Sequence, residues 1–568
     1  MNFLKRKKIN RLRLKIAAWE TKQIISGLII SLLIFPLSEG AIKSRVTFHQ
    51  SSKRLDRYDY VEVCVEVVSP DEENPFTEVT LSGEFGLTGK SLNKVDGFCD
   101  SEDGSVYRIR FMPTEPGRYE YTIRLHGSGL DAGKTGSFTA RQGKRKGIVR
   151  VDSRYPWHFV WEGTGEHFFW NSTTTYWLLG WRNESIIRES LDRLAKLKIN
   201  RIRVALNGRT TDGMRWKEPL AMPGEQFQYR LEPWPAARPE NVQDPGYDVT
   251  RFNLDHFRKA ERMLKYARER NIIVSLIFHL DGRDAGVDPF GKAAMGGEDE
   301  QRYYRYCVAR FGAFANIMWD VTNEWHLFRN EAWVNKMGAL IKQCDPYDHT
   351  TSVHGTGHFP FRQSPWCDYA MYQCWDEHGS YEFMLKNRRE QAQTGRPIPQ
   401  VNEEYGYEDH YPFPWGEKRK WPLRIAESRR KLAWEMTMAG CFQTTGERAN
   451  VLGYGGWITG RGNSEMIMLK GYARMKEFFE KLPWWRLEPR TEPATDSAMC
   501  LAEAGRLYVL YLPNGGRTTL TLEDGPYSVT RFNPRNGSTL KLKDVVQKKW
   551  TSPLMPDTED WVLLLKKQ

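Results

Sequence analysis

The fold is decided by a stretch in the middle of the chain, IMWDVTNEW, which occupies residues 317–325. Its first part is rich in apolar and β-branched residues, which is typical of a buried strand. The strand ends in Asn323-Glu324, so a carboxylate stands where a strand passes into a loop. Apolar residues at helical spacing lie on both sides, at 304–311 and 333–344. The stretch therefore predicts one strand of an alternating strand-and-helix region.

The same alternation extends over residues 150–484. We expect eight strands there, at residues 167–171, 201–206, 272–278, 317–322, 350–353, 369–373, 398–401 and 441–444. Further helices are expected at 187–197, 257–267 and 465–482. Eight strand-then-helix units favour a (β/α)8 TIM barrel over an open sheet.

The two flanking regions have a β pattern. Residues 61–67, 107–111 and 119–125 alternate apolar and polar side chains, which indicates half-buried strands. Residues 45–143 are therefore expected to form an immunoglobulin-like β-sandwich. Short strands return at 507–512, 518–522, 527–532 and 561–565, so residues 487–568 predict a small antiparallel β-sandwich domain. The expected fold class is multidomain α/β plus β, with a central TIM barrel flanked by the two β domains.

Composition excludes several classes of protein. With 40% hydrophobic and 27% charged residues the chain is neither a polytopic membrane protein, a collagen nor a disordered chain. The formal net charge is +12, but no basic stripe is interleaved with stacking aromatics, so a nucleic-acid partner is not expected. A mild positive field is compatible with an anionic substrate.

The start of the chain has the order of an export signal. Residues 1–22 are largely basic and polar, and residues 24–35 form an apolar run that is shorter than the roughly 20 residues of a membrane span. Ser38 and Gly40 then place small residues before Ala41. Residues 1–40 therefore predict a signal peptide, with an uncleaved signal anchor or a misassigned start as the alternatives. We expect a secreted, periplasmic or cell-surface protein that meets a membrane only through such an anchor.

The chain's eight cysteines include no CxxC pair and no His cluster at zinc spacing. A bridge between Cys64 and Cys99 and buried free thiols are both open from the sequence. No metal site and no cofactor is expected.

Two strand ends carry carboxylates in matching settings. The fourth strand ends in Asn323-Glu324, and the seventh is followed by Asn402-Glu403-Glu404. Strands four and seven face each other across a barrel mouth, and catalytic groups lie at the carboxyl ends of barrel strands. Glycoside hydrolysis requires such a pair, one carboxylic acid to protonate the leaving oxygen and one carboxylate to attack or to activate water. We therefore predict Glu324 and Glu404 as catalytic residues. Asn323 is expected to hydrogen-bond a sugar 2-hydroxyl.

Other polar and aromatic residues near strand ends are candidates for holding the sugar. They are Arg203, His279, His354, Tyr372 and Trp457. Trp375 and Trp415 are, with Trp457, candidates for stacking platforms.

The sequence resembles the clan A glycoside hydrolases and, more closely, the apiosidase-like glycoside hydrolases. In the latter a sandwich precedes the barrel, and a small β domain of the collagen-binding type often follows. The resemblance covers nearly all of the expected mature chain, and its matching stretches are residues 247–253, 319–325, 402–408 and 561–563. It implies a retaining double displacement with Glu324 as acid/base and Glu404 as nucleophile.

Two stretches depart from the family pattern. Relatives have an Asp in a Leu-Gly-Asp run on strand one, where this chain has WNST at 170–173, so an apiose substrate is not implied. Relatives often have Gly-Glu-Pro on strand seven, where this chain has Glu403-Glu404-Tyr405. Side chains alternate between the two faces of a strand, so we expect only one of the two glutamates to point into the pocket. The Asn-x-Glu register selects Glu404.

The sequence thus predicts an exported retaining glycosidase that acts on an oligosaccharide or polysaccharide. A polysaccharide lyase or an inverting hydrolase on the same barrel is the alternative among enzymes. A non-catalytic carbohydrate- or matrix-binding protein on a TIM-barrel scaffold is the alternative outside them, although it would not need both Glu324 and Glu404.

Overall fold

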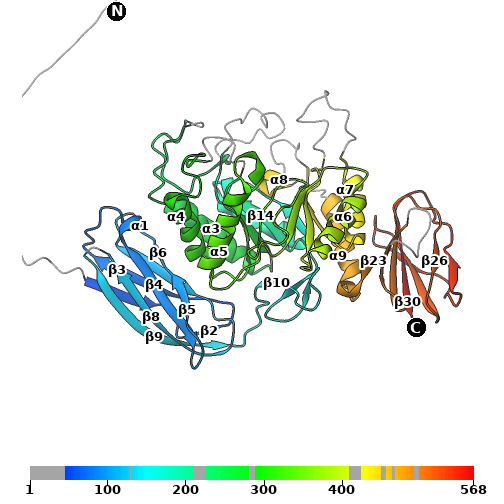
Figure 1. The fold of residues 1–568 in the computed structure, drawn as a ribbon, viewed down its shortest axis with the longest axis horizontal. Coiled ribbons are helices and arrows are strands. Elements are labelled where there is room, and N and C mark those ends of the chain that lie inside the picture. Colours follow the sequence, from blue (N-terminus) through cyan, green and yellow to red (C-terminus); the bar gives the residue numbers. More distant parts are fainter. Residues whose placement is uncertain are drawn as a thin grey trace, which may run out of the picture. The chain divides into compact units, whose positions relative to one another are not determined.

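The protein is described from a computed structural model, in which residues 45–127, 129–209, 226–241, 244–280, 288–408, 424–448, 456–462, 467–490 and 498–568 are placed. The predicted signal segment, residues 1–40, lies outside these ranges. Residues 44–568 form one compact unit. Three regions follow one another along it (Figure 1).

The first region is a sandwich of two sheets. One sheet has the order β1-β3-β7-β6 and the other β2-β9-β8-β4-β5. Their strands are β1 (Arg45–Gln50), β2 (Arg54–Asp56), β3 (Val61–Val68), β4 (Thr80–Leu87), β5 (Asn93–Asp96), β6 (Phe98–Cys99), β7 (Val106–Phe111), β8 (Gly117–His126) and β9 (Asp131–Arg141), with the short helix α1 (Pro75–Glu78) before β4. Burial alternates along β3 and β8, as the period-two pattern predicts, because one face of each packs into the core between the sheets.

The second region is a parallel barrel in the order β19-β18-β17-β14-β13-β22-β21-β20. Its strands are β13 (Ser172–Thr174), β14 (Arg201–Ala205), β17 (Ile273–Ile277), β18 (Ile317–Asp320), β19 (Thr351–Ser352), β20 (Ala370–Gln373), β21 (Gln400–Glu404) and β22 (Phe442–Thr445). The end strands β19 and β20 come next to each other, because the Asp368 backbone N–H donates to Thr351 O at 2.9 Å. The barrel is therefore nearly closed.

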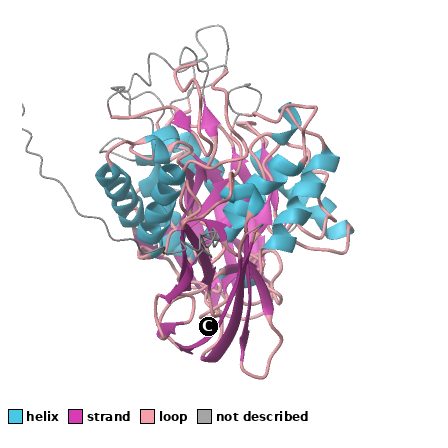
Figure 2. Cartoon of the chain, turned by 90° about the vertical axis from the view of Figure 1, so that its left-hand side faces the viewer, coloured by secondary structure: helices cyan, strands magenta, loops and turns pink. Residues whose placement is uncertain are grey.

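Helices surround the barrel strands (Figure 2). They are α2 (Glu184–Lys196), α3 (Leu254–Arg268), α4 (Glu298–Phe311), α5 (Glu331–Cys344), α6 (Ser380–Gln393), α7 (Ala426–Met438), α8 (Gly456–Thr459) and α9 (Ile467–Phe479). Asn183, Asn253 and Asn330 cap α2, α3 and α5, each with its side chain accepting a backbone N–H of the first turn. The barrel strands are covered by helices on one face and packed against the barrel interior on the other. Every residue of β14 and β17 is therefore buried.

The first barrel strand differs from the prediction. Residues 167–168 form β12 (His167–Phe168), which pairs antiparallel with β11 (Phe159–Trp161), and β11 pairs with β10 (Val149–Val151). The barrel strand begins only at Ser172, which pairs parallel with Arg201 and with Thr444. The apolar residues before Ser172 resemble a barrel strand because they are buried, but residues 167–168 belong to this small antiparallel sheet.

The third region is a six-stranded antiparallel sheet, β23-β24-β25-β30-β27-β28, with the pair β26-β29. Its strands are β23 (Glu488–Arg490), β24 (Met499–Glu503), β25 (Leu507–Leu512), β26 (Thr519–Thr521), β27 (Tyr527–Phe532), β28 (Thr539–Lys541), β29 (Lys549–Thr551) and β30 (Trp561–Lys567). It is fixed to α7 by a buried ion pair between Arg430 and Asp560 at 2.7 Å and by the stacked rings of Trp434 and Tyr511. The predicted fold class, a TIM barrel with antiparallel sheets before and after it, is confirmed.

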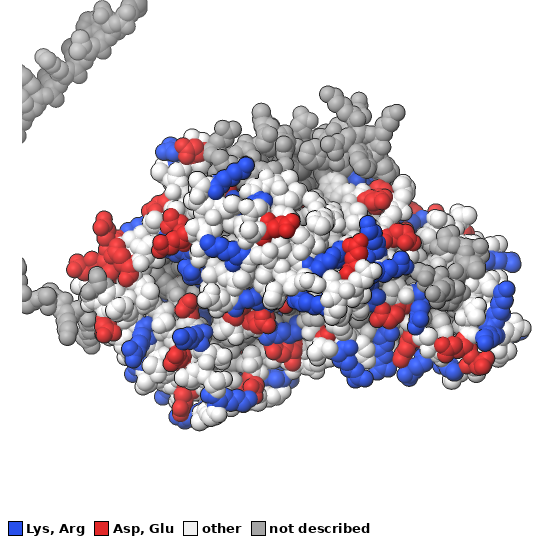
Figure 3. All heavy atoms as spheres, viewed as in Figure 1, with Lys and Arg blue, Asp and Glu red and all other residues white. Residues whose placement is uncertain are grey.

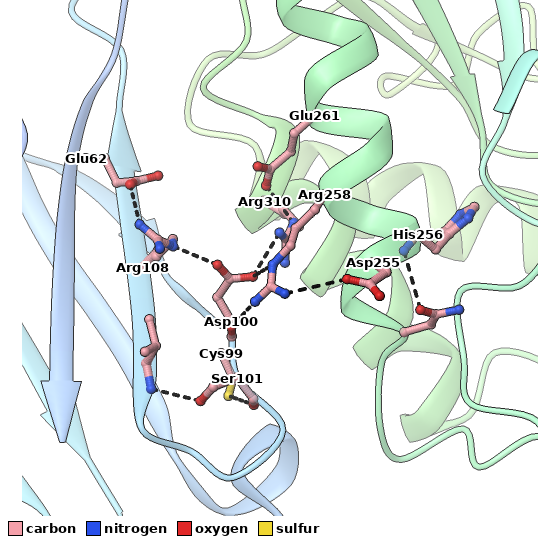
Figure 4. A network of polar contacts seen from close by, with 12 residues as sticks. Glu62, Cys99, Asp100, Ser101, Arg108, Asp255, His256, Arg258, Glu261 and Arg310 are labelled. Carbon is pink, nitrogen blue, oxygen red and sulfur yellow. Dashed lines mark hydrogen bonds and ion pairs between the residues drawn. The ribbon is translucent and has the colours of Figure 1, made fainter. Parts of the chain in front are cut away.

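The sandwich is joined to the barrel by a buried network of charges (Figure 4). Asp100 of the sandwich contacts Arg310 of α4 at 3.0 Å and Arg258 of α3 at 3.3 Å. Arg110 of β7 donates to Glu261 of α3 at 2.8 Å. Because Arg110 and Arg310 are almost fully buried, the two regions are held together by ion pairs that water does not screen.

All eight cysteines lie in the described residues and all are free thiols, so the open alternative of a Cys64–Cys99 bridge is not realised. In the same ranges no helix has the length and apolar character needed to cross a membrane. On the face seen in Figure 3, Lys and Arg are intermixed with Asp and Glu rather than gathered into one basic patch.

Candidate functional site

The parallel strands bring Glu324 and Glu404 to the same end of the barrel. Glu404 is the last residue of β21, and Glu324 follows β18 by four residues. Glu324 is near enough for its charge to raise the pKa of Glu404. Glu404 is 6% exposed, whereas Glu324 is partly exposed. The site thus contains one deeply buried and one more accessible carboxyl group.

Glu404 receives a hydrogen bond on each oxygen. Gln373 Nε2, on β20, donates to Glu404 Oε1 at 3.1 Å, and the Tyr176 hydroxyl donates to Glu404 Oε2 at 3.1 Å. Burial and the neighbouring charge of Glu324 nevertheless raise the pKa of Glu404 to about 8. Since interacting carboxyls titrate together, this raised pKa belongs to the pair, which keeps one shared proton near neutral pH.

Glu324 has a left-handed backbone, with φ 48° and ψ 47°, at the start of the short 3-10 helix η2 (Trp325–Leu327). A non-glycine residue in this region is strained, and such residues cluster at functional sites. The backbone beside it is held on both sides, because the Asn323 N–H donates to His279 O at 3.0 Å and the Trp325 N–H donates to His354 O at 3.3 Å. Neighbouring strand ends therefore fix the position of Glu324.

Glu403 lies in the barrel interior and is paired with Arg201. Both side chains are fully buried, with Arg201 Nη2 at 2.8 Å from Glu403 Oε1 and Nη1 at 2.9 Å from Oε2. The register between β20 and β21 shifts here, since Tyr372 pairs with Asn402 but Gln373 pairs with Glu404. A bulge of this kind interrupts the alternation of side chains. Both glutamates are therefore buried, but only Glu404 meets the hydrogen-bond donors at the strand ends, so the choice of Glu404 as the residue in the pocket stays a prediction.

Arg203 links the two strand ends that carry the carboxylates. Its Nη2 donates to Asp320 Oδ2 at 2.7 Å and to Asn323 Oδ1 at 3.1 Å, and its Nη1 donates to the Tyr176 hydroxyl at 3.0 Å. Arg203 and Asp320 are fully buried, and burial raises the pKa of Asp320 to about 6 despite the nearby guanidinium. Arg203 and Asn323, two of the residues predicted to hold the sugar, are thus in direct contact.

The two predicted histidines are buried and differ in position. His354 Nε2 is 3.9 Å from Glu404 Oε2, and burial with the charge of Arg203 holds the pKa of His354 well below its usual value, so its ring is neutral. His279 contacts Asn207 Nδ2 through its Nδ1 at 2.8 Å and lies 3.7 Å from Glu300 Oε1. Burial lowers the pKa of His279 to about 3. The His354 side chain is therefore beside the carboxylate pair, whereas the His279 ring makes its contacts with Asn207 and Glu300.

An aromatic group borders Glu404. The Trp457 and Tyr407 rings are stacked, with centroids 4.2 Å apart and an angle of 12° between planes, and the Tyr176 ring meets Trp457 edge-on. Trp375, which is partly exposed, meets Tyr407 edge-on at 5.9 Å. Trp457 and Trp375 are therefore close to the site as predicted, while Trp415 lies outside the described residues.

Tyr372 does not face the site. Its hydroxyl donates to Gln400 Oε1 at 2.6 Å and accepts from Arg362 Nη1 at 3.0 Å, and its ring packs against Phe359 and Phe383. Side chains alternate along β20, so Gln373 points toward Glu404 and Tyr372 points outward, toward α6. The substrate-binding role predicted for Tyr372 is corrected accordingly.

The sequence analysis missed Tyr176, Gln373 and Tyr407. Tyr176 lies two residues beyond β13, so the misplaced first strand hid its position at a strand end. Gln373 directly follows the predicted candidate Tyr372 and is the last residue of β20. Tyr407, which hydrogen-bonds Glu404, lies three residues beyond β21 in the stretch already quoted for the family resemblance.

No group of three or more His, Cys, Asp and Glu side chains within the described ranges is arranged to hold a metal ion. The arrangement is instead a carboxyl pair with polar and aromatic neighbours. It is suited to proton transfer and nucleophilic attack at one bond.

Known structures that are described as glycoside hydrolases have a fold similar to that of this chain. A protein from Bacteroides vulgatus ATCC 8482, described as a "putative glycoside hydrolase", is 19% identical and superposes with a TM-score of 0.74, covering 91% of this chain and 100% of its own. A family 5 glycoside hydrolase from the same organism is 14% identical with a TM-score of 0.56, covering 74% of this chain and 94% of its own. At these identities the likeness shows a glycoside hydrolase-like fold.

Family models match two regions. Residues 54–126 match a domain of unknown function, DUF5060, and residues 157–449 match the model "Apiosidase-like, catalytic domain". A search of curated proteins gives no match. The second model spans more than half of the chain and includes every predicted site residue except Trp457, so the protein belongs to the apiosidase-like family.

Proposed function

We propose that this protein is a glycoside hydrolase that cleaves an oligosaccharide or polysaccharide with retention of configuration. The observation that carries the proposal is that Glu324 and Glu404 follow or end barrel strands β18 and β21 at the same end of a glycoside hydrolase-like barrel. Their environments differ as the two roles require. Glu404 is buried and receives hydrogen bonds on both oxygens, and Glu324 is the more accessible group.

In the proposed mechanism Glu404 is the nucleophile and Glu324 is the acid/base. Glu324 protonates the glycosidic oxygen while Glu404 attacks the anomeric carbon, so the bond to the leaving group breaks as an ester to Glu404 forms. Glu324, now charged, takes a proton from water, and that water displaces Glu404. A retaining mechanism requires the carboxyl groups to be about 5–5.5 Å apart, and an inverting one about 6.5–9.5 Å.

The neighbouring residues have supporting roles in this proposal. Asn323, held by Arg203, is placed to hydrogen-bond the sugar 2-hydroxyl, a contact that strengthens in the transition state. Trp375, which is partly exposed beside the buried stack of Trp457 and Tyr407, offers an aromatic surface to a sugar face. We further propose that the protein is exported, with residues 1–40 acting as a signal peptide or anchor.

The test is hydrolysis of a panel of aryl glycosides and of neutral and acidic glycans, with analysis of the anomeric form of the first product. We expect retention of configuration. Glu404→Gln should abolish turnover, and azide should not restore a retained product. Glu324→Gln should still form the glycosyl-enzyme from a substrate with a good leaving group, and azide should then yield a glycosyl azide of retained configuration. Binding of glycans without any turnover by the wild type would contradict the proposal and favour a binding protein.

A further inference from the structure

A buried tyrosine that the proposed mechanism does not use lies between Arg203 and Glu404. Tyr176 follows β13 and is 3% exposed. Its hydroxyl oxygen is 3.0 Å from Arg203 Nη1, 3.1 Å from Glu404 Oε2 and 3.2 Å from the Tyr407 hydroxyl. The three neighbours come from β14, from the end of β21 and from the loop after it, so one hydroxyl joins distant parts of the barrel.

The donor and acceptor roles at this hydroxyl follow from chemistry. Arg203 has no acceptor, so its N–H occupies one lone pair of the Tyr176 oxygen. An ionised Glu404 has no donor, so the single Tyr176 proton points to Glu404. Asp320, Arg203, Tyr176 and Glu404 therefore form one directed chain of hydrogen bonds, in which Arg203 polarises the Tyr176 O–H and makes it a stronger donor.

We propose that Tyr176 is a positioning residue that couples Arg203 to Glu404 and holds this carboxylate in its attacking orientation. The inference rests on the proposed role of Glu404 as nucleophile. A direct ion pair with Arg203 would occupy a carboxylate oxygen and strongly weaken its basicity. The intervening hydroxyl gives Glu404 one charge-assisted hydrogen bond while the guanidinium stays paired with Asp320.

Several groups face Glu404 and together set its proton affinity. Burial and the charge of Glu324, after β18, raise the pKa of Glu404, and hydrogen bonds from Tyr407 and Tyr176 lower it, as does the charge of Arg203. Gln373 of β20 adds an uncharged donor at 3.1 Å. His354, after β19, is neutral because its pKa lies well below the usual value. Loss of the Tyr176 hydroxyl should therefore raise the pKa of Glu404 further.

The test compares Tyr176→Phe with Tyr372→Phe. Tyr372 is an unusually close control, because it is fully buried, accepts from an arginine at 3.0 Å and donates to a side-chain oxygen at 2.6 Å, but on the outer face of the barrel. Both variants lose a buried hydroxyl that bridges a guanidinium and an acceptor. Only Tyr176→Phe removes a donor from Glu404.

The first readout needs no turnover. A carboxyl whose native pKa lies above its unfolded value makes unfolding stability fall as pH rises, until the native group has also lost its proton. The melting temperature of the wild type, measured from pH 5 to pH 10, should therefore decline and then level off. In Tyr176→Phe the pH at which the melting temperature levels off should move up by about one unit, because losing one hydrogen bond to a charged group shifts its pKa by about that much. Tyr372→Phe should leave it in place.

Two further measurements complete the test. In a Glu404→Gln background the added Tyr176→Phe change should no longer move the pH profile of stability. With an aryl glycoside, the basic limb of kcat/KM, which reports loss of the same proton from the carboxyl pair, should move upward in Tyr176→Phe alone, in step with stability. If the profiles of Tyr176→Phe and Tyr372→Phe coincide, the Tyr176 bond is merely structural and the inference fails. If the wild type shows no hydrolysis but the stability profile moves, the coupling holds and the proposed function fails.

Discussion

Glu403 and Glu404 are adjacent carboxylates that should respond to the same substitution in opposite ways. In Glu403→Gln, the fully buried Arg201 loses the one carboxylate that it pairs with among the described residues, at 2.8 and 2.9 Å. Breaking a buried ion pair by removing one partner costs about 3–5 kcal/mol. The new amide oxygen still accepts from Arg201, which also retains Ser172 Oγ at 3.2 Å and Tyr369 Oη at 3.3 Å. We therefore expect the free energy of unfolding to fall by about 3 kcal/mol, the lower end of this range.

Glu404→Gln should not destabilise the protein at neutral pH. The native pKa of Glu404 is raised to about 8 from 4.5, so the native state holds a proton that the unfolded state has lost. Stability contributed by the carboxyl form therefore falls as pH rises between these two values. A glutamine does not titrate, so its side chain contributes no such loss of stability as pH rises. The stability of Glu404→Gln relative to the wild type should accordingly increase from pH 5 to pH 8.

The assay is urea unfolding at pH 5, 7 and 8, followed by circular dichroism and tryptophan fluorescence. A double variant, Arg201→Met with Glu403→Gln, is the control, because it leaves no unpaired buried cation and should recover part of the loss. The reasoning is refuted if Glu403→Gln is as stable as the wild type, or if Glu404→Gln is the less stable of the two. If Glu403→Gln is stable but inactive, its inactivity would indicate that Glu403 takes part in catalysis, and the choice of nucleophile would be reopened.

Other consequences can be measured separately. Because one proton must remain on the carboxyl pair, kcat/KM for an aryl glycoside should fall as pH rises through about 8, as a pH–rate profile would show. Trp457→Ala removes the ring stacked on Tyr407, so KM for a glycan should rise by up to about tenfold in steady-state kinetics. Arg110→Met leaves Glu62 and Glu261 with one cation fewer at the sandwich interface and should destabilise the protein by about 3 kcal/mol in urea unfolding. If residues 1–40 are a signal peptide, intact-mass analysis of exported protein should give a chain that begins at Ala41, and a soluble product that retains Met1 would contradict this.

The sequence alone was sufficient for the architecture and for the positions of the two glutamates. Period-two alternation at 61–67 and helical spacing at 257–267 are local patterns, and each became the expected element, β3 and α3. The end of the fourth strand at Asn323-Glu324 could be found because a buried strand and the polar residues after it are contiguous in the chain. The pairing of this end with Glu404 then follows from barrel geometry.

Only the tertiary structure decided which side chains meet there. Tyr176 bonds Glu404 across 228 residues of sequence, and no local pattern records such a contact. The register shift beside Glu403 and the outward direction of Tyr372 depend on how β20 pairs with β21, and alternation counted along one strand gives neither. The physical reason is that periodicity reports which face of an element is buried, whereas the partner of a buried polar group is set by the strands and loops that packing brings beside it.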